Sequence, residues 1–182
     1  NFDINKDEYA DLPINFINET PDFCPKISFL KIEIENDVQE YKSELKNYFR
    51  DLNAKKINFF TDISNYISYE LGQPTHCYDA EKMNSNMSLE KIKSSSSFET
   101  LLDKNININK GDYVFKSGNN LINLAGVVGG KNTACSKLTK TAIVECAYFN
   151  PDSIIGKTIK YDINSEAAYK FERGVDINSH NN

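Results

Sequence analysis

Several features that identify common classes of protein are missing from this sequence. Its 182 residues contain no P-loop, no G-x-G-x-x-G, no G-x-S-x-G and no H-E-x-x-H motif, and no internal repeat. No apolar run approaches the roughly 20 residues that a membrane-spanning helix needs, and the N-terminus has no signal-like pattern. We therefore expect no membrane partner, and no short catalytic signature indicates the function.

Cysteine and histidine are too few and too scattered to indicate a metal site or a disulfide framework. None of the four cysteines forms a C-x-x-C pair, and only two histidines are present. A structural zinc site needs four such ligands at close spacing, and a chain of this length does not depend on disulfides for a core. We expect reduced, mostly buried thiols in a cytoplasmic protein, with no metal in this domain.

Positive charge is also in short supply. The chain has 21 Lys and Arg against 26 Asp and Glu, a net charge of −5. A free-standing nucleic-acid binder usually carries a basic patch and a high pI, so this class is disfavoured. A domain that touches one end of a nucleic acid held by other domains remains compatible with this charge. The apolar content of 40% predicts a globular domain with one core.

Glycine is scarce, yet three of the eight glycines lie within residues 124–130, which read L-A-G-V-V-G-G. Gly126, Gly129 and Gly130 stand in a segment that is otherwise apolar and β-branched. Glycine in such a setting indicates a sharp turn or a close approach of the backbone to another group.

A carboxylate follows this glycine-rich segment. Residues 141–144 form an apolar run that predicts a buried strand, and Glu145 stands at its end. A carboxylate at a buried position needs a partner. From the residues alone, the partner is either a lysine such as Lys140 or a ligand in a pocket lined by glycine.

Periodicity and capping residues predict the remaining elements. In the first half they are a strand in residues 24–34, a helix in 38–52 capped by Asn36 or Asp37, a strand in 55–60, a helix from Thr61 or Asp62 to Gly72, and a loop in 73–79. In the second half they are strands in 98–102 and 113–115, a hairpin turn at 117–120 leading into 121–122, a short helix from Asn150 to Gly156, and a helix from Ser165 to Gly174. Short strands spaced in this way favour a sandwich or curled sheet.

Domain boundaries are predicted from composition. Residues 1–23 are acidic and interrupted by proline, which indicates an extended arm from a preceding domain. Residues 24–176 form the main domain, and residues 177–182 begin a linker to the next domain. We expect the chain to be a fragment of a longer protein.

Four segments in order carry a family resemblance. They are residues 60–66 (FTDISNY), 70–79 (ELGQPTHCYD), 124–130 (LAGVVGG) and 165–176 (SEAAYKFERGVD). Together they resemble the editing domain in the beta subunit of bacterial phenylalanyl-tRNA synthetase, over about residues 24–176. The resemblance implies an α+β fold with a β-sandwich-like core of unusual topology and flanking helices, in three layers.

The resemblance also implies an activity and partners. The domain would hydrolyse the ester of tyrosine wrongly attached to the phenylalanine tRNA, and the alternative is a scaffold or RNA-positioning module that has lost editing. The implied partners are the 3′ end of tRNA(Phe), the other domains of the beta subunit, and the alpha subunit in a heterotetramer. ATP and Mg²⁺ would bind elsewhere in the synthetase, with no cofactor in this domain. Lys170 and Arg173 suit either the C-terminal end of a helix or a tRNA contact.

Site residues carried over by the resemblance fall into two groups. His76 and Asn65 are the catalytic pair beside the scissile ester. In the substrate-binding group, Glu145 would recognise the tyrosine hydroxyl, Gly129 and Gly130 would line the pocket, and Ala167 would close it. Ser64 and Pro74 would form part of its wall.

The chemistry expected here is direct attack by water. The sequence shows no Ser/His/Asp triad, and Cys77 follows His76 directly. In an extended segment the two side chains point in opposite directions, which disfavours a thiol nucleophile. We expect His76 and Asn65 to hold the water. The sequence departs from the family's usual residues at Ser64, Cys77, Lys131 and Ala168.

Overall fold

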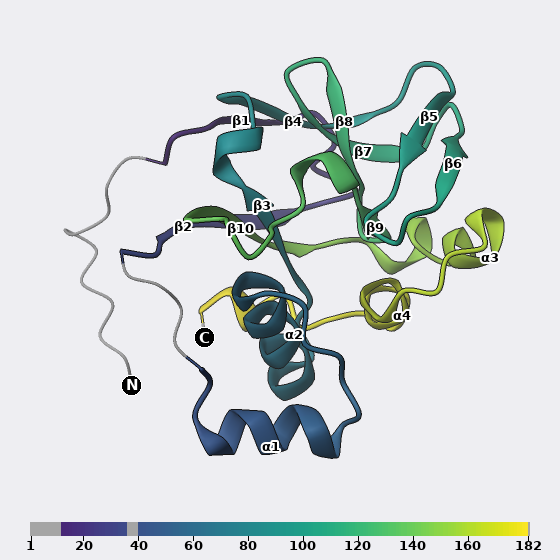
Figure 1. Ribbon diagram of the computed structural model, residues 1–182. Helices are drawn as coiled ribbons and strands as arrows, with labels where there is room; N and C mark the ends of the chain where they lie inside the picture. The colour runs from purple at the N-terminus through teal and green to yellow at the C-terminus, as the bar shows by residue number, and fades with distance from the viewer. Residues whose placement is uncertain (1–11, 36–39, 182) are drawn as a thin grey trace.

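The computed structural model describes residues 12–35 and 40–181, and in them the fold combines three β-sheets with four α-helices (Figure 1). The five-stranded sheet has the order β1-β4-β7-β8-β9. Its strands are β1 (Asn15–Asn18), β4 (Asn86–Lys91), β7 (Tyr113–Ser117), β8 (Asn120–Leu124) and β9 (Val128–Gly129). The predicted arm therefore contributes a strand, because β1 pairs in parallel with β4.

The second sheet has three strands in the order β2-β10-β3. They are β2 (Lys26–Glu33), β10 (Thr141–Tyr148) and β3 (Thr75–Asp79). The predicted first strand is confirmed. The loop predicted for residues 73–79 is wrong for its last five residues, which form β3. Glu145 lies inside β10, not at the end of a strand, because pairing with β2 and β3 extends β10 to Tyr148.

The third sheet is a hairpin of β5 (Ser96–Glu99) and β6 (Asn105–Ile108). The sequence predicted β5 in part and missed β6, whose Asn residues alternate with buried Ile106 and Ile108. The hairpin turn predicted at 117–120 is confirmed between β7 and β8, where Gly118 takes a positive φ of 57°.

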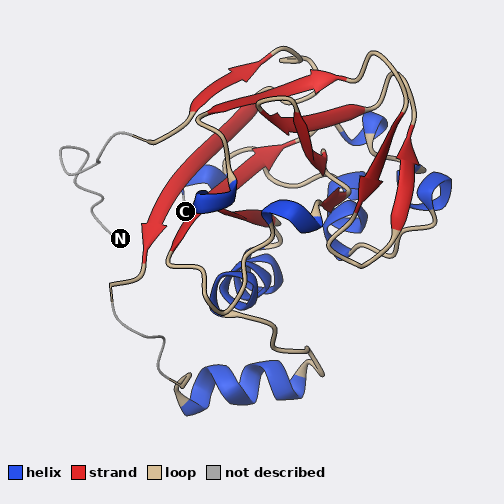
Figure 2. Cartoon of the chain, turned by 45° about the horizontal axis from the view of Figure 1, so that its top comes forward, coloured by secondary structure: helices blue, strands red, loops and turns tan. Residues whose placement is uncertain are grey.

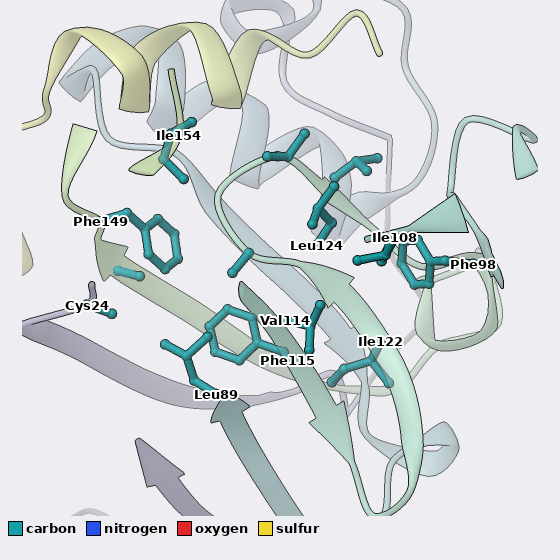
Figure 3. Packing of buried hydrophobic residues seen from close by; sticks show 14 of the residues in the cluster. Cys24, Leu89, Phe98, Ile108, Val114, Phe115, Ile122, Leu124, Phe149 and Ile154 are labelled. Carbon is teal, nitrogen blue, oxygen red and sulfur yellow. The ribbon is translucent and has the colours of Figure 1, made fainter. Parts of the chain in front are cut away.

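The two larger sheets enclose the main core. Tyr78, Ile143 and Ala147 on one face of the β2-β10-β3 sheet belong to the same buried cluster as Leu89 and Phe115 of the five-stranded sheet. Figure 3 shows Leu89 and Phe115 turned towards Phe149, which follows β10. The mixed α+β class and the sandwich-like core expected from the sequence are confirmed.

The opposite face of the β2-β10-β3 sheet is covered by a helix. Cys77, Ala142 and Val144 on that face pack against Phe59 and Phe60 at the start of α2 (Phe59–Leu71). α1 (Ser43–Asp51) lies on the same side of the sheets as α2 (Figure 2). The sheet that carries Glu145 is therefore covered on both faces.

The first two helices begin at different places from those predicted. The strand predicted for 55–60 is wrong, because Asn58 caps α2: its side chain accepts a hydrogen bond from the Thr61 N–H at 3.1 Å. The predicted end at Gly72, with φ of 72°, is confirmed. The predicted caps Asn36 and Asp37 of the first helix lie outside the described residues. α1 begins only at Ser43, and Tyr41 instead donates a hydrogen bond to Asp62 of α2 at 2.8 Å.

The C-terminal helices are short. Asn150 caps a 3-10 turn at Pro151–Ser153 as predicted, and α3 (Lys157–Tyr161), which the sequence did not predict, begins after Gly156. α4 (Glu166–Arg173) has the predicted cap at Ser165 and the predicted end at Gly174. Further 3-10 turns lie at Ala80–Lys82, Lys131–Thr133 and Ser179–Asn181.

Candidate functional site

The pairing of β3 with β10 brings two predicted site residues together. His76 lies directly opposite Glu145 in the antiparallel ladder. Opposite residues of such a pair share one face of the sheet, and Tyr78, two residues after His76, shares it too. This face looks into the core between the sheets. The structure therefore groups an imidazole, a carboxylate and a phenol at one place.

Glu145 is buried, with 5% of its surface exposed, and its partner is a residue that the sequence did not predict. The Tyr78 hydroxyl donates a hydrogen bond to Glu145 Oε2 at 2.6 Å, and Asn123 Nδ2 donates to the Tyr78 oxygen at 3.0 Å. Asn123 lies on β8, so this hydrogen-bond chain joins the two larger sheets. Within the described residues, Glu145 Oε1 has no hydrogen bond.

Burial dominates the electrostatics of this chain of groups. It raises the pKa of Glu145 to about 7, and the hydrogen bond from Tyr78 acts in the opposite direction. The pKa of Tyr78 is raised well above 10 by burial and by the Glu145 charge beside it. The phenol thus keeps its proton when Glu145 ionises, and it remains a donor to the carboxylate.

His76 has an unpaired ring nitrogen. Its ring meets that of Tyr78 edge-on, with centroids 4.5 Å apart, and its Nε2 atom is buried without a hydrogen-bond partner among the described residues. Burial lowers the pKa of His76 to about 4, so the ring is neutral at pH 7. A buried polar atom without a partner is unusual in a native protein. A neutral imidazole at this position can hold a water molecule or a polar ligand atom.

Gly129 lies against this histidine. A Cβ atom at Gly129 would be 2.1 Å from His76 Cε1 and 2.8 Å from Leu101 Cδ2, far inside normal contact distance. The close approach predicted for the glycine-rich segment is confirmed there, and the predicted sharp turn is confirmed at Gly126, whose φ is 72°. Gly130 instead borders a polar surface cavity of about 410 Å³ that also reaches Thr133.

Ala167, predicted to close the pocket, lies at the start of α4. Ser165, which caps α4 by accepting from the Ala168 N–H at 3.1 Å, also donates to the Val127 carbonyl at 2.7 Å. The start of α4 is therefore tied to the backbone two residues before Gly129. Ala167, the second residue of α4, is half-buried and packs against the main core.

Two predicted residues lie on α2, which covers the opposite face of the sheet from Glu145. The Ser64 hydroxyl donates to the Thr75 carbonyl at 2.7 Å. Asn65 follows it and is half-buried, and no hydrogen bond among the described residues joins it to His76. Pro74 is buried immediately before β3, where its carbonyl accepts from the Gln73 side chain at 2.9 Å.

Cys77 points away from His76, as predicted. It packs with Phe60 of α2, and its Sγ lies 3.6 Å from the Phe60 carbonyl oxygen. Burial raises the pKa of this thiol to about 12. A neutral thiol on the far face of the sheet is a poor nucleophile for chemistry at His76.

The last helix carries two cations, whose side chains have partners within the protein. Lys170 donates to the Ser68 carbonyl and hydroxyl of α2, at 2.5 and 2.8 Å. Arg173 stacks on the ring of Tyr169, 3.4 Å from its centroid. These contacts support a packing role for both side chains at the end of α4.

Sequence reasoning missed Tyr78, Asn123 and Leu101. The prediction of a loop at residues 73–79 hides the period-two relation between His76 and Tyr78, which β3 makes real. Recognition of β3 would have placed both side chains on one face. No sequence signal singles out Asn123 or Leu101, since both reach the site through the arrangement of the sheets.

The described part of the chain offers no group of three or more His, Cys, Asp or Glu side chains arranged to hold a metal ion. All four cysteines are free. Among the helices of this part, none is long and apolar enough to cross a membrane.

Comparisons with known proteins identify relatives of this chain in fold and in sequence. A solved N-terminal fragment of the phenylalanyl-tRNA synthetase beta subunit from Pyrococcus horikoshii matches 76% of this chain and 44% of that chain, with a TM-score of 0.52 at 10% identity, which supports the fold alone. Phenylalanine–tRNA ligase beta subunits are 29% identical over 158 residues in Neisseria meningitidis (87% of this chain, 20% of the relative) and 33% over 145 residues in Fusobacterium nucleatum (80% and 18%).

The chain spans about a fifth of the length of these curated relatives. These similarities confirm the relationship to phenylalanyl-tRNA synthetase beta subunits that the four motifs indicated. The sequence model of the B3/4 domain matches residues 24–182, nearly the whole chain. This chain therefore belongs to the B3/4 domain family.

Proposed function

We propose that this chain is the editing domain of a phenylalanyl-tRNA synthetase beta subunit, and that it hydrolyses the ester of tyrosine attached to tRNA(Phe). The observation that carries the proposal is the pairing of His76 with Glu145 on one face, beside the backbone of Gly129. The similarity to phenylalanine–tRNA ligase beta subunits supports the substrate class. The proposed partners are the 3′ end of tRNA(Phe), the other beta-subunit domains and the alpha subunit, with ATP and Mg²⁺ bound elsewhere.

Tyrosine and phenylalanine differ by one hydroxyl, and this site suits the discrimination between them. A hydrophobic synthetic pocket rejects a ligand that only adds a hydroxyl by roughly 100-fold. A site built to hydrogen-bond that hydroxyl rejects the ring that lacks it by about 10⁴–10⁵-fold, because its own polar group is left unpaired. Glu145 provides such a group, since its Oε1 has no hydrogen bond among the described residues.

The hydrolytic step needs a positioned water, because the aminoacyl ester is already activated. His76 is neutral at pH 7, and its unpaired Nε2 provides one hydrogen-bonding position for that water. We also propose Asn65 for this task on the resemblance alone, because it lies on α2, which packs against the opposite face of the sheet from His76. Cys77 takes no part, because its thiol lies on the other face of the sheet.

The proposal is tested by deacylation of Tyr-tRNA(Phe) and Phe-tRNA(Phe) by the full-length synthetase that contains this chain. We expect rapid clearance of the tyrosyl ester and slow clearance of the phenylalanyl ester. Glu145→Gln should reduce the preference for the tyrosyl ester more than it reduces hydrolysis as such. Glu90→Gln is the matched control, because Glu90 is also a strand carboxylate but pairs with Lys116 at 2.8 Å, away from the site.

The alternative is a scaffold that positions RNA without catalysis. It predicts tyrosyl-tRNA deacylation no faster than the spontaneous rate, with or without the Glu145 substitution. That result would overturn the proposed function. Equal losses on both esters in Glu145→Gln would remove the recognition role while leaving hydrolysis in place.

A further inference from the structure

The hydrogen-bond chain from Asn123 to Glu145 has a fixed direction. The Asn123 side chain presents its Nδ2 to the Tyr78 oxygen, so the amide donates and the phenol oxygen accepts. A phenol has only one hydrogen, which is then directed to Glu145 Oε2, 2.6 Å away. The carboxylate is therefore held as an acceptor at Oε2, with Oε1 left for another donor.

Tyr78 is held in place. The Tyr78 residue has no exposed surface. In the β3–β10 ladder it lies opposite Ile143, and on its other side its backbone forms a β-bridge to Ala134. The His76 ring packs edge-on against its ring. A side chain fixed on every side does not leave when a ligand arrives, so Tyr78 is a fixed part of the site and does not act as a removable plug.

We propose that Tyr78 and Asn123 are positioning residues for Glu145: their hydrogen-bond chain orients the carboxylate so that Oε1 accepts the hydroxyl of the bound tyrosyl group. This inference rests on the proposed editing function. In this arrangement the selectivity of Glu145 depends on a tyrosine within the protein. A phenylalanyl ring would leave Oε1 of an oriented, buried carboxylate without a donor, which is unfavourable.

Among the described residues, Tyr78 is the group that donates a hydrogen bond to Glu145. His76 is neutral at pH 7, because burial lowers its pKa to about 4. The thiol of Cys24 stays protonated, because burial raises its pKa to about 12. Cys77 and Cys146 lie on the opposite face of the sheet, and burial raises their pKa values to about 12 and 11. The hydrogen bond from Tyr78 is what lowers the pKa of Glu145 against the effect of burial.

The first variant is Tyr78→Phe, which removes only the hydroxyl. A hydrogen bond to a charged group is strong enough that its loss should reduce tyrosyl-over-phenylalanyl selection by about tenfold or more. The acid limb of tyrosyl-tRNA clearance should also move to higher pH, by about one unit for each tenfold loss, because Glu145 without this donor holds its proton more tightly. Phenylalanine charging by the same enzyme should be unchanged.

Tyr113→Phe is the matched control. Tyr113 stacks on Phe23 in the core, and its hydroxyl makes no hydrogen bond within the described residues. Selection and the pH profile of this variant should match those of the wild type. A purely structural role for Tyr78 would change yield or thermal stability but would not move the acid limb.

Asn123→Leu and the double variant complete the test. Asn123→Leu should shift the acid limb in the same direction by a smaller amount, because the phenol loses the donor that orients it. Combined with Tyr78→Phe, it should add no further shift, since both variants remove the same chain. If Tyr78→Phe fails to fold, the shift in Asn123→Leu decides the matter by itself.

The outcomes separate the two proposals. A wild-type enzyme that does not clear tyrosyl-tRNA overturns the proposed function. A wild-type enzyme that clears it, with Tyr78→Phe unchanged in selection and pH profile, overturns only the positioning role. Faster clearance by Tyr78→Phe would show that Tyr78 competes with the substrate hydroxyl for Glu145, and it would also overturn the positioning role.

Discussion

Substitution of Gly129 by alanine should displace the His76 ring while it lowers the stability of the fold only slightly. Gly129 does not have a positive φ, so its backbone accepts an alanine without conformational strain. The added Cβ would lie 2.1 Å from His76 Cε1, whereas carbon atoms in contact stay about 3.5–4.0 Å apart. The histidine ring must therefore move by more than about 1 Å.

The expected cost to stability is small and the expected cost to activity is large. Overpacking costs about 1–3 kcal/mol. We expect about 1 kcal/mol, because within the described residues no hydrogen bond to His76 Nε2 is broken when the ring moves. In a domain of this size that corresponds to a fall in Tm of about 2–4 °C. Misplacement of a catalytic group by about 1 Å can cost about 100-fold in rate.

The matched control is Gly72→Ala. Gly72 has a φ of 72°, and in the described part of the chain no atom lies within 4 Å of an added Cβ. The substitution therefore costs about 1–2 kcal/mol of backbone strain without touching the site. Tyrosyl-tRNA clearance by the full-length synthetase and thermal unfolding are measured for both variants. Wild-type clearance in Gly129→Ala, or an equal loss of clearance in both variants, would refute the reasoning.

Three further predictions concern other parts of the fold. Cys77→Ala should keep tyrosyl-tRNA clearance within about twofold of the wild type, since the thiol faces α2; a loss of about 100-fold would restore the thiol as a nucleophile. Ser165→Ala should lower the unfolding free energy by about 1–2 kcal/mol in denaturant titrations, because it removes the α4 cap and the bond to Val127, whereas Ser165→Thr should recover most of it. Burial raises the pKa of Asp112, but hydrogen bonds from Lys157 and its neighbours outweigh this effect and lower the pKa below 3.8. The stability that Asp112 contributes above pH 3.8 is therefore lost as the pH falls through this lowered pKa. Asp112→Asn should flatten that pH dependence of the unfolding free energy in unfolding curves measured across the pH range.

The parts of the fold that the sequence predicts well depend on local signals. Gly72 ends α2, Ser165 and Gly174 bound α4, and Gly118 turns the β7–β8 hairpin. Each of these residues acts within a few positions of itself, through a cap or a positive φ. The sequence alone is sufficient for such elements.

The parts that failed depend on partners far along the chain. Residues 75–79 form a strand because β10, almost 70 residues later, supplies an edge for them to pair with. The strand predicted for residues 55–60 is wrong, because Asn58 caps a helix whose first residues, Phe59 and Phe60, pack on the sheet. Tertiary context overrides local propensity in both cases.

The candidate site likewise combines residues that the sequence indicates with residues that only long-range contacts bring in. His76 and Gly129 lie in motifs that carry the resemblance, Glu145 follows a predicted buried strand, and the structure places these three together. The resemblance could not indicate the chain through Tyr78 and Asn123, whose contacts span 67 and 45 residues. The catalytic role of Asn65 and the place of Ser64 in the pocket wall stay predictions, since α2 packs on the far face of the sheet.

The position of Glu145 in the middle of a central strand makes the site intolerant of insertions and deletions. β10 is hydrogen-bonded along both edges, to β2 and to β3. A shift of its register by one residue would turn Glu145 towards α2 and bring Val144 into the core in its place, because successive side chains alternate between faces. Substitutions around the site can adjust its chemistry, but a change in the length of β10 before Glu145 would exchange the two faces of the strand and remove the site from the protein.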